Sequence, residues 1–259
     1  MKELVAHGLR CGYHKHDVVK GIDFSLNPGE VLVVLGANGS GKTTLFKAIM
    51  RFLPLSAGHI SVDGQDVLHM SLLEYSRIFS YIPQQHTPVF SYTVEETAMM
   101  GRASRVATFS TPGKEDKAAV KKALETLKIT HLKDKYYTRI SGGERKLALI
   151  ARALCQQSKI IVMDEPSSDL DYANQQLMIN TILSLKEYGY SIILSTHAPE
   201  YPFSVADKVL LLKNGQAVSY GAPGGALNRG TLSHAFGVPM DVFELDDQKG
   251  STRKICLPL

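Results

Sequence analysis

The stretch Gly36-Ala37-Asn38-Gly39-Ser40-Gly41-Lys42-Thr43-Thr44 decides the fold of this chain. It follows five apolar residues, Val31–Leu35, which are typical of a strand buried on both faces. Residues 45–50, behind it, suit a helix. A buried strand, a glycine-rich turn and a helix start are the surroundings of a phosphate-binding loop. A flexible Gly/Ser turn would need neither flank, so we predict that this loop binds a nucleoside triphosphate.

The residue types of the loop suit the chemistry of a phosphate. Its glycines let successive backbone N–H groups turn inward around an anion, and the helix start adds its dipole. Lys42 can reach the β- and γ-phosphates, and the Thr43 hydroxyl can bind Mg²⁺. The loop by itself does not say how the energy is used, because phosphate loops serve kinases, motors and switches alike.

The composition is that of an ordinary soluble protein, with 259 residues, 44% of them apolar and 21% charged. No apolar run approaches the roughly 18 residues that cross a bilayer. Residues 1–7 lack the apolar core of a signal peptide. The net charge of +4 is scattered, so the lysines within 121–122 and 133–135 indicate solvated faces rather than a nucleic-acid site. We expect a protein of the cytosol or of the cytosolic face of a membrane.

The predicted elements change character along the chain. Residues 4–10 and 21–26 form short strands on either side of a polar stretch, and Asp63-Gly64 predicts a hairpin turn, which favours an antiparallel start. Residues 85–154 predict a mainly helical segment that opens on a capping box of Thr93 and Glu96. Beyond it, strands at Ile160–Met163, 191–195 and 209–212 alternate with a helix, which predicts a mainly parallel sheet.

A second candidate element of the site is the acid pair Asp164-Glu165, directly after the apolar run Ile160–Met163. A buried strand that ends in an acid places a carboxylate at the carboxyl edge of the sheet, beside the phosphate loop. Asp164 would hold Mg²⁺ directly or through water, and Glu165 would act as general base for hydrolysis. The pair could also be the polar end of a strand, but the intact loop favours the catalytic interpretation.

A third candidate element is Ile140-Ser141-Gly142-Gly143-Glu144. Ser141 and Glu144 have the spacing of a capping box. The two glycines are poor helix formers, so they make sense if another group must approach that backbone closely. Because a helix N-terminus is also an anion site, we predict that the segment both caps a helix and holds a γ-phosphate.

With these residues, the chain resembles the nucleotide-binding subunit of an ATP-binding cassette (ABC) transporter. Residues 141–144 are similar to the signature motif of that family, and the resemblance covers residues from about 3 to about 230. It implies an α/β fold: a P-loop NTPase (RecA-like) core with an N-terminal antiparallel β-subdomain and an inserted helical signature subdomain. We expect a cassette over residues 1–230, with its helical part at about 85–154, and a poorly anchored C-terminal tail over 231–259.

The resemblance also implies roles for individual residues. The catalytic set is Glu165, His197, Gln84 and Lys42, and the Mg²⁺ ligands are Thr43, Gln84 and Asp164. Gln85 is the alternative to Gln84 in register. The ATP-binding set comprises Tyr13 on the adenine, Gly36, Ala37, Asn38, Gly39, Ser40, Gly41, Lys42, Thr43, Thr44, Ser141, Gly142, Gly143, Glu144 and Asp171. Asp171 would act in a loop that crosses the dimer interface, or would merely cap the next helix. No catalytic position is missing, so the resemblance predicts an active ATPase.

The implied mechanism needs two copies of the chain. In the family, the signature segment of one subunit meets the ATP held by the other, so two Mg-ATP lie between two-fold-related cassettes. The resemblance further implies two membrane-spanning permease subunits, an indirect solute-binding protein, no nucleic-acid partner, and a place at the cytoplasmic face of a prokaryotic cell membrane.

The cargo is suggested by residues 88–96, Pro-Val-Phe-Ser-Tyr-Thr-Val-Glu-Glu, and by Met99-Met100-Gly101-Arg102. These segments resemble importers of metal chelates, namely ferric siderophores, heme, cobalamin and, in one branch, molybdate or tungstate. Alternatives are generic packing against any permease, another type of transporter, or a cassette ATPase that acts on nucleic acid or in translation. The chain carries one phosphate loop and no long heptad repeat, and a small-molecule kinase would not explain residues 141–144.

Overall fold

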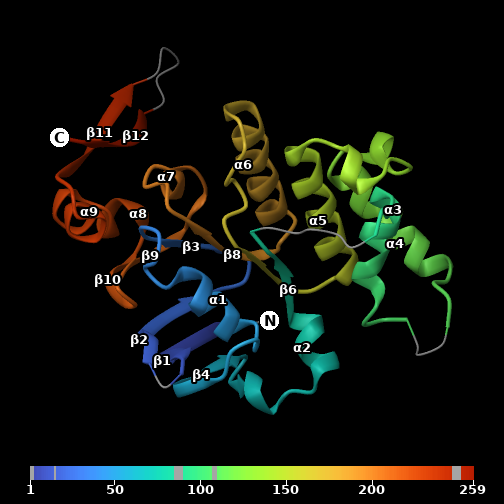
Figure 1. Cartoon of the computed structure of the whole chain (residues 1–259), viewed down its shortest axis with the longest axis horizontal. Helices are drawn as coiled ribbons and strands as arrows, with labels where there is room; N and C mark the ends of the chain where they lie inside the picture. The colour runs from blue at the N-terminus through green and yellow to red at the C-terminus, as the bar shows by residue number, and fades with distance from the viewer. Residues whose placement is uncertain (1–2, 15, 85–89, 107–109, 247–251) are drawn as a thin grey trace. The chain divides into compact units, whose positions relative to one another are not determined.

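The computed structural model describes residues 3–14, 16–84, 90–106, 110–246 and 252–259. The chain divides into two units (Figure 1). Unit 1 comprises Met1–His69 and Ile182–Leu259, and unit 2 comprises Met70–Thr181. Unit 1 thus joins the two ends of the chain, and unit 2 is formed by its middle.

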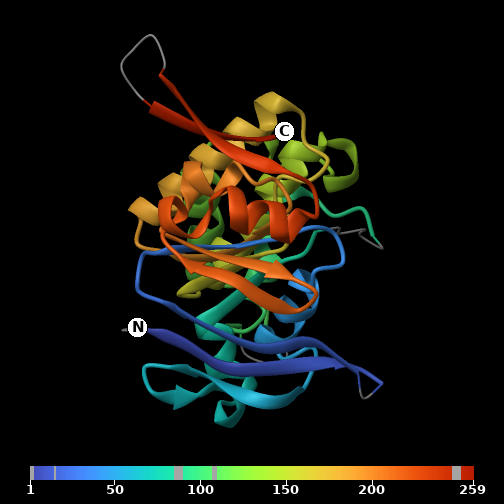
Figure 2. The same cartoon turned by 90° about the vertical axis from the view of Figure 1, so that its left-hand side faces the viewer.

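Unit 1 begins with an antiparallel sheet in the strand order β2-β1-β4-β5 (Figure 2). The strands are β1 (Leu4–Tyr13), β2 (His16–Leu26), β4 (Leu55–Val62) and β5 (Gln65–Asp66). Asp63 and Gly64 have φ of 54° and 81°, so the predicted hairpin turn is confirmed. The expected ends of the first two strands were wrong, because β1 and β2 pair through the polar stretch as far as Tyr13 and His16. Backbone pairing carries these polar residues, since their side chains need not be buried.

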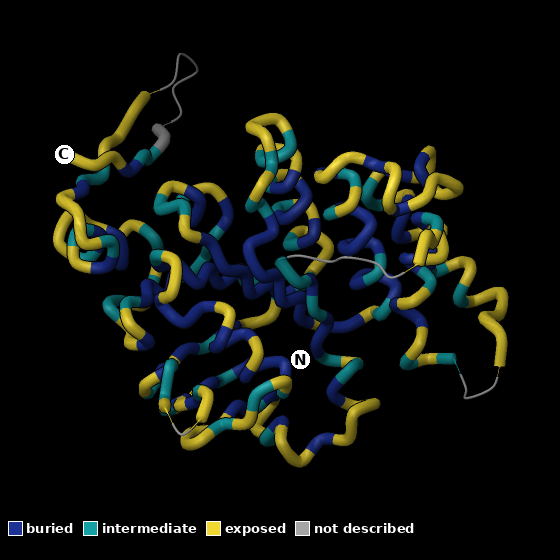
Figure 3. The backbone as a smooth tube through the Cα atoms, viewed as in Figure 1, coloured by how far each residue is buried: buried dark blue, intermediate teal, exposed yellow. Residues whose placement is uncertain are grey.

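The parallel strands of unit 1 follow in the order β10-β9-β3-β8. Here β3 (Val31–Leu35) lies between β8 (Ser191–Thr196) and β9 (Lys208–Lys213) and is parallel to both. Antiparallel β10 (Gln216–Gly221) follows β9 across the turn Asn214-Gly215. Every residue of β3 and β8 is buried (Figure 3). The predicted parallel sheet is confirmed, and its central strand leads into the phosphate loop and α1 (Lys42–Ile49).

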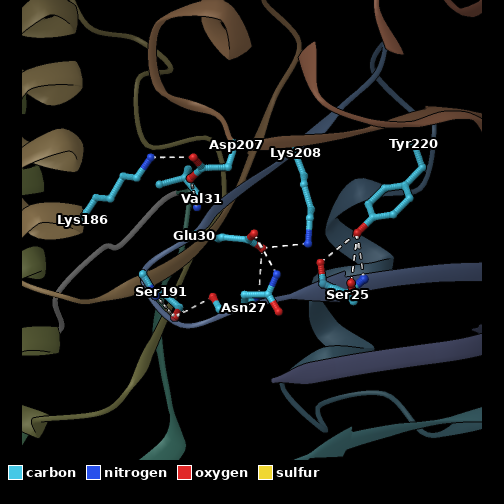
Figure 4. A network of polar contacts seen from close by, with 10 residues as sticks. Ser25, Asn27, Glu30, Val31, Lys186, Ser191, Asp207, Lys208 and Tyr220 are labelled. Atoms are coloured by element: carbon cyan, nitrogen blue, oxygen red, sulfur yellow. Dashed lines mark hydrogen bonds and ion pairs between the residues drawn. The ribbon is translucent and has the colours of Figure 1, made fainter. Parts of the chain in front are cut away.

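A polar network fixes the start of β3 (Figure 4). Glu30 forms an ion pair with Lys208 at 2.8 Å and accepts hydrogen bonds from the backbone N–H and the side-chain amide of Asn27. Asp207 accepts a hydrogen bond from the Val31 N–H at 2.8 Å and forms an ion pair with Lys186 at 2.6 Å. The network therefore sets the strand that carries the loop against its neighbour β9.

The C-terminal part of unit 1 is anchored. It contains α8 (Pro223–Ala226), α9 (Arg229–Phe236) and a hairpin of β11 (Met240–Asp246) and β12 (Thr252–Pro258), and α7 (Tyr201–Val205) precedes β9. Leu232 and Met240 pack with Leu35 and Val209 in one buried cluster. The expectation of a poorly anchored tail was wrong for this segment, because a few scattered apolar residues give no periodic signal yet fit the end of the sheet. The expected boundary between residues 230 and 231 falls inside α9.

Unit 2 is built on two parallel strands, β6 (Phe79–Ile82) and β7 (Ile160–Met163). Helix α2 (Leu72–Ile78) leads into β6, and α6 (Tyr172–Glu187) begins after β7. The described elements between the two strands are helical, with α3 and α4 packed against α5 (Figure 1). They are α3 (Val94–Met99), α4 (Lys114–Thr126), α5 (Gly142–Gln156) and the short 3₁₀ turns Met100–Arg102, Thr130–Leu132 and Tyr137–Arg139; a further turn, Val67–His69, lies in unit 1.

A buried arginine joins three elements of unit 2. Arg102 donates to the Asp116 carboxylate on α4 at 2.7 Å and to the Cys155 carbonyl on α5 at 2.9 Å. The hydrogen bond from Arg102, together with one from the Gly113 N–H, holds the pKa of Asp116 below its usual value. Across the described ranges, no helix is long and apolar enough to pass through a membrane.

Candidate functional site

The phosphate loop in unit 1 joins the end of β3 to the start of α1. The Gly36 N–H donates to the Thr196 carbonyl at 3.3 Å, which ties the loop to the end of β8. Gly39 and Gly41 have φ of 78° and 106°, the left-handed region that only glycine enters without strain. These two turns lead the loop around the N-terminus of α1, where the first N–H groups have no acceptor within the helix. The loop backbone therefore has the turns and the helix N-terminus that the predicted anion site needs, and the binding of a phosphate there stays a prediction.

The side chains of the loop fit a phosphate group. Lys42 is 5% exposed and folds back on the loop, where its Nζ donates to the carbonyls of Gly36 at 2.8 Å and Ala37 at 3.2 Å. The buried Ser40 hydroxyl has no hydrogen-bond partner among the described residues. A buried hydroxyl without a partner is costly, and a phosphate oxygen would satisfy it. Thr43 and Asn38 are exposed, and Thr44 is buried.

Two further predicted residues lie in the same unit. His197 directly follows β8, whose Thr196 pairs with Leu35, so this histidine is exposed at the sheet edge from which the loop begins. Tyr13 ends β1 and is 42% exposed. The Lys47 ammonium of α1 lies 3.3 Å from the Tyr13 hydroxyl and 5.7 Å from its ring centroid. The loop helix therefore holds the ring in place while leaving it accessible for stacking.

The acid pair lies in unit 2 at the end of β7. The Asp164 N–H continues the ladder with β6 through the Ile82 carbonyl at 2.9 Å, and its side chain is buried. Burial, the Asp164 charge and a hydrogen bond with Asp164 raise the pKa of Tyr81. The Gln84 amide donates to the Glu165 carboxylate at 3.3 Å. The structure therefore brings Gln84 to the predicted general base, and the alternative Gln85 lies outside the described residues.

The backbone after the acid pair is strained. Glu165 and Asp169 have φ of 45° and 61°, a backbone conformation that residues other than glycine rarely adopt. Such residues cluster at functional sites. The Ser168 N–H and hydroxyl both donate to the Glu165 carbonyl and hold this turn. Asp171 accepts from the Asn174 N–H at 2.8 Å, so it caps α6; a role at the dimer interface stays a prediction.

The predicted signature segment forms the N-terminus of α5. Ser141 and Glu144 form the predicted capping box, and their hydrogen bonds lower the pKa of Glu144. A Cβ on Gly143 would lie 2.3 Å from the Asn174 side-chain oxygen, so any other residue there requires the Asn174 side chain to move. A Cβ on Gly142 would meet no described atom within 4 Å. The described part of the chain therefore gives no steric reason for glycine at 142, which fits the approach of an external group.

Sequence reasoning missed Lys146 on α5. Its Nζ donates to the Gln84 carbonyl at 2.5 Å, within the group that contains Glu165. The helical spacing could have identified this residue. Gly143 lies three residues before Lys146 and Ile150 four residues after it, and both belong to the buried face of the helix. A lysine on such a face indicates a specific partner.

The predicted Mg²⁺ ligands belong to both units, with Thr43 in unit 1 and Gln84 and Asp164 in unit 2. Among the described residues, no three His, Cys, Asp or Glu side chains form a cluster that could hold a metal ion. Hydroxyl, carboxylate and amide oxygens nevertheless suit Mg²⁺, which usually takes one or two carboxylates and completes its shell with phosphate and water. The chemistry of the donors therefore fits a nucleotide-bound ion.

A family model described as ABC transporter matches residues 19–168, which include the phosphate loop, the signature segment and the acid pair. The chain belongs to the ABC transporter family. It is 34% identical over 220 residues to the molybdate import ATP-binding protein MolC of Haemophilus influenzae, covering 85% of this chain and 81% of MolC. It is 31% identical over 238 residues to the hemin import ATP-binding protein HmuV of Streptomyces coelicolor, covering 92% and 84%.

A solved structure of a metal-chelate type ABC transporter in an inward-facing conformation is similar over the whole chain. The TM-score is 0.90 at 30% identity, with 100% of this chain and 98% of the other covered. The fold is therefore the cassette fold, with an antiparallel β-subdomain, a parallel sheet and an inserted helical segment, and the fold prediction is confirmed. The family's ATP-binding proteins are ATPases coupled to transport, so family membership implies that this chain binds ATP.

Proposed function

We propose that the chain is the ATP-hydrolysing subunit of a prokaryotic importer, peripheral to the cytoplasmic face of the cell membrane. Two copies close on two Mg-ATP and energise the import of a metal chelate, such as a siderophore, heme or cobalamin complex, or of an oxyanion. The similarity to the molybdate and hemin import proteins and to the metal-chelate type transporter supports this assignment.

One observation carries the two-subunit part of the proposal: the exposed N-terminus of α5. Ser141 and Gly142 are exposed there, and the described chain gives no steric reason for glycine at 142. Two-fold symmetry lets each copy bring this surface to the ATP on its partner's phosphate loop. Closure is a population shift, because ATP bonds both copies only in the closed state and hydrolysis removes the bridge.

The site residues divide the hydrolytic reaction among them. Lys42 and the loop N–H groups hold the β- and γ-phosphates, and His197 contacts the γ-phosphate. Gln84 orients a water molecule, and Glu165 accepts its proton as the water oxygen attacks the γ-phosphorus. The bond to the β–γ bridging oxygen breaks, which leaves ADP and phosphate. Mg²⁺, held by Thr43, Asp164 and Gln84, would neutralise the charge that develops on the phosphate oxygens.

Hydrolysis is expected to depend on the dimer. In a dilution series of the full chain with Mg-ATP, the turnover rate per subunit should rise with protein concentration, because each site needs a second copy. Ser141→Arg should abolish this rise while keeping ATP binding, since the long side chain would block the partner's nucleotide. A rate per subunit that is independent of concentration and unchanged in Ser141→Arg would contradict the two-subunit site.

A groove in unit 2 supports contact with a permease. It has a volume of about 520 Å³, and its lining includes Tyr92, Met99, Met100 and Val106. Met100 is 39% exposed, and Phe90 packs edge-on against Tyr92 at 5.9 Å between ring centroids. An apolar groove with flexible methionines suits the apolar face of a helix. The segment is also the one that resembles metal-chelate importers, although residues 88 and 89 lie outside the described ranges.

Purification with a membrane partner tests the importer assignment. The tagged chain should retain a polytopic membrane protein from detergent-solubilised membranes, and the reconstituted complex should take up hemin, molybdate or a ferric siderophore when ATP is supplied. Met100→Glu should lose the membrane protein because it replaces an apolar side chain of the groove by a second carboxylate beside Glu96. Leu245→Glu, on the exposed hairpin, serves as control. Recovery of nucleic acid in place of a membrane protein would favour the alternative cassette ATPase.

A further inference from the structure

Helix α5 carries two features one turn apart. Its N-terminus presents Ser141 and Gly142, and the partly buried Lys146 follows. The Lys146 ammonium donates to the main-chain carbonyl of Gln84 at 2.5 Å. The same helix therefore bears the surface proposed to meet the partner's ATP and a direct bond to the loop that holds Gln84.

A second hydrogen bond joins Gln84 to the predicted general base, Glu165. The Gln84 side chain donates to the Glu165 carboxylate at 3.3 Å, so two hydrogen bonds join Lys146 to Glu165 through one residue. All three residues belong to unit 2. A lysine ammonium has three N–H donors, so the bond to the Gln84 carbonyl leaves two for other acceptors.

Three acids act on the ammonium group through their charges. Asp169, Asp164 and Glu165 all attract its positive charge. Carboxylates repel one another, and the positive charge of an ammonium group that attracts them all reduces that repulsion.

We propose that Lys146 is a positioning residue that couples the signature helix to the hydrolytic groups of its own subunit. It fixes the Gln84 main chain, and through it the Gln84–Glu165 contact, and it offsets the charge of the acids. When the partner's ATP engages Ser141 and Gly142, α5 transmits that engagement to Gln84 and Glu165. This inference rests on the proposed function, because it concerns the same ATPase site.

The experiment compares steady-state hydrolysis of Mg-ATP by the full chain and its variants at one high protein concentration. Lys146→Met removes the charge and the donors but keeps the length of the side chain. Lys146→Gln keeps an amide donor without the charge. Lys122→Met is the matched control, because Lys122 is exposed on α4 of the same unit. ATP affinity and the thermal unfolding midpoint are measured for every variant.

Lys146→Met is expected to lower kcat by about 10- to 100-fold, the cost of misplacing a reacting group by about 1 Å. KM for ATP should stay unchanged, because the phosphate loop that binds the nucleotide is intact. Lys146→Gln should show a smaller loss of kcat, and Lys122→Met should match the wild type. A lysine that only stabilised the fold would lower the unfolding midpoint of Lys146→Met without this selective loss of kcat.

Two results would overturn the inference. One is a wild-type kcat in Lys146→Met. The other is that kcat and KM both change across the variants only in proportion to the fall in the unfolding midpoint. If Lys146→Met does not fold, Lys146→Gln decides by the same criterion, since wild-type kcat in that variant also overturns it. Glu165→Gln separates this inference from the proposed function. That variant should bind ATP and barely hydrolyse it; normal turnover there would refute the site itself, whatever Lys146 does.

Discussion

Two adjacent glycines at the start of α5 lie in different surroundings. Gly143 faces the side chain of Asn174, and an added Cβ would lie 2.3 Å from the amide oxygen. Gly142 faces open space within the described chain. Glycine is unfavourable in a helix by about 1 kcal/mol relative to alanine. Because a side chain at 142 would have room, glycine there lowers the stability of the isolated subunit without a steric reason inside the chain.

Alanine should therefore be tolerated less well at 143 than at 142. Gly143→Ala should lower the free energy of unfolding relative to Gly142→Ala by about 0.5–1.5 kcal/mol, because the Asn174 side chain must leave its present rotamer. Gly142→Ala should leave it unchanged or raise it by up to about 1 kcal/mol. Urea unfolding of the two variants measures this difference.

Turnover should not follow stability in this pair. Gly142→Ala should hydrolyse ATP more slowly than the wild type despite its stable fold, because the methyl group lies where the partner's nucleotide would approach. Full turnover in Gly142→Ala would contradict a site shared between two copies. Gly143→Ala serves as the comparison, because there the added methyl group meets the Asn174 side chain of the same subunit.

At the scale of elements, the ion pair that fixes the start of β3 is partly buried. Burial raises the pKa of Glu30, but the hydrogen bonds from Lys208 and Asn27 and the Lys208 charge outweigh it and leave this pKa below its usual 4.5. Burial lowers the pKa of Lys208, and its contact with Glu30 reverses this and leaves it above 10.5. The stabilising contribution of Glu30 is therefore full above pH 4.5 and is lost as the pH falls through its lower folded value. The contribution of Lys208 is full below pH 10.5 and is lost as the pH rises through the higher pKa that Lys208 has in the folded protein.

Glu30→Gln should consequently reduce the acid sensitivity of the protein. At about pH 7 we expect it to lower the free energy of unfolding by about 1 kcal/mol, and the difference from wild type should shrink as the pH falls below about 4. Urea unfolding at several pH values measures both. Glu244→Gln is the control, because the Glu244–Lys254 pair on the hairpin is more exposed and should contribute less. An equal effect of both substitutions at every pH would contradict this account.

At the scale of the whole molecule, the two ends of the chain depend on each other. Leu232 and Met240, late in the sequence, complete a cluster around Leu35, at the end of the strand that leads into the phosphate loop. Cys256 joins the same cluster from the last strand. The C-terminal segment is thus part of the support of the nucleotide loop in unit 1.

Leu232→Ala should destabilise the protein by about 2–5 kcal/mol, because it leaves a cavity at a fully buried position. Leu245→Ala, on the hairpin and 53% exposed, should change the free energy of unfolding by less than about 0.5 kcal/mol. Chemical unfolding monitored by circular dichroism measures both. Similar effects of the two substitutions would show that the C-terminal segment is not anchored through Leu232.

Much of the fold was predictable because its signals are local. Asp63-Gly64 and Asn214-Gly215 adopt the positive φ values that the hairpin turns require. The strands Val31–Leu35 and Ile160–Met163 are short, fully apolar runs. The strand ends near Tyr13 and the anchoring of Leu232 were not predictable, because they depend on pairing and packing with distant segments rather than on any local pattern.

The sequence by itself determined the phosphate loop, the acid pair and the signature segment, because each needs a fixed order of residues along a few turns of chain. Only the tertiary structure decided that Gln84 donates to Glu165, that Lys146 holds Gln84, and that Gly143 but not Gly142 is packed inside the chain. These contacts join residues up to 81 positions apart. Their geometry arises when strands and helices meet in three dimensions, which no short stretch of sequence encodes.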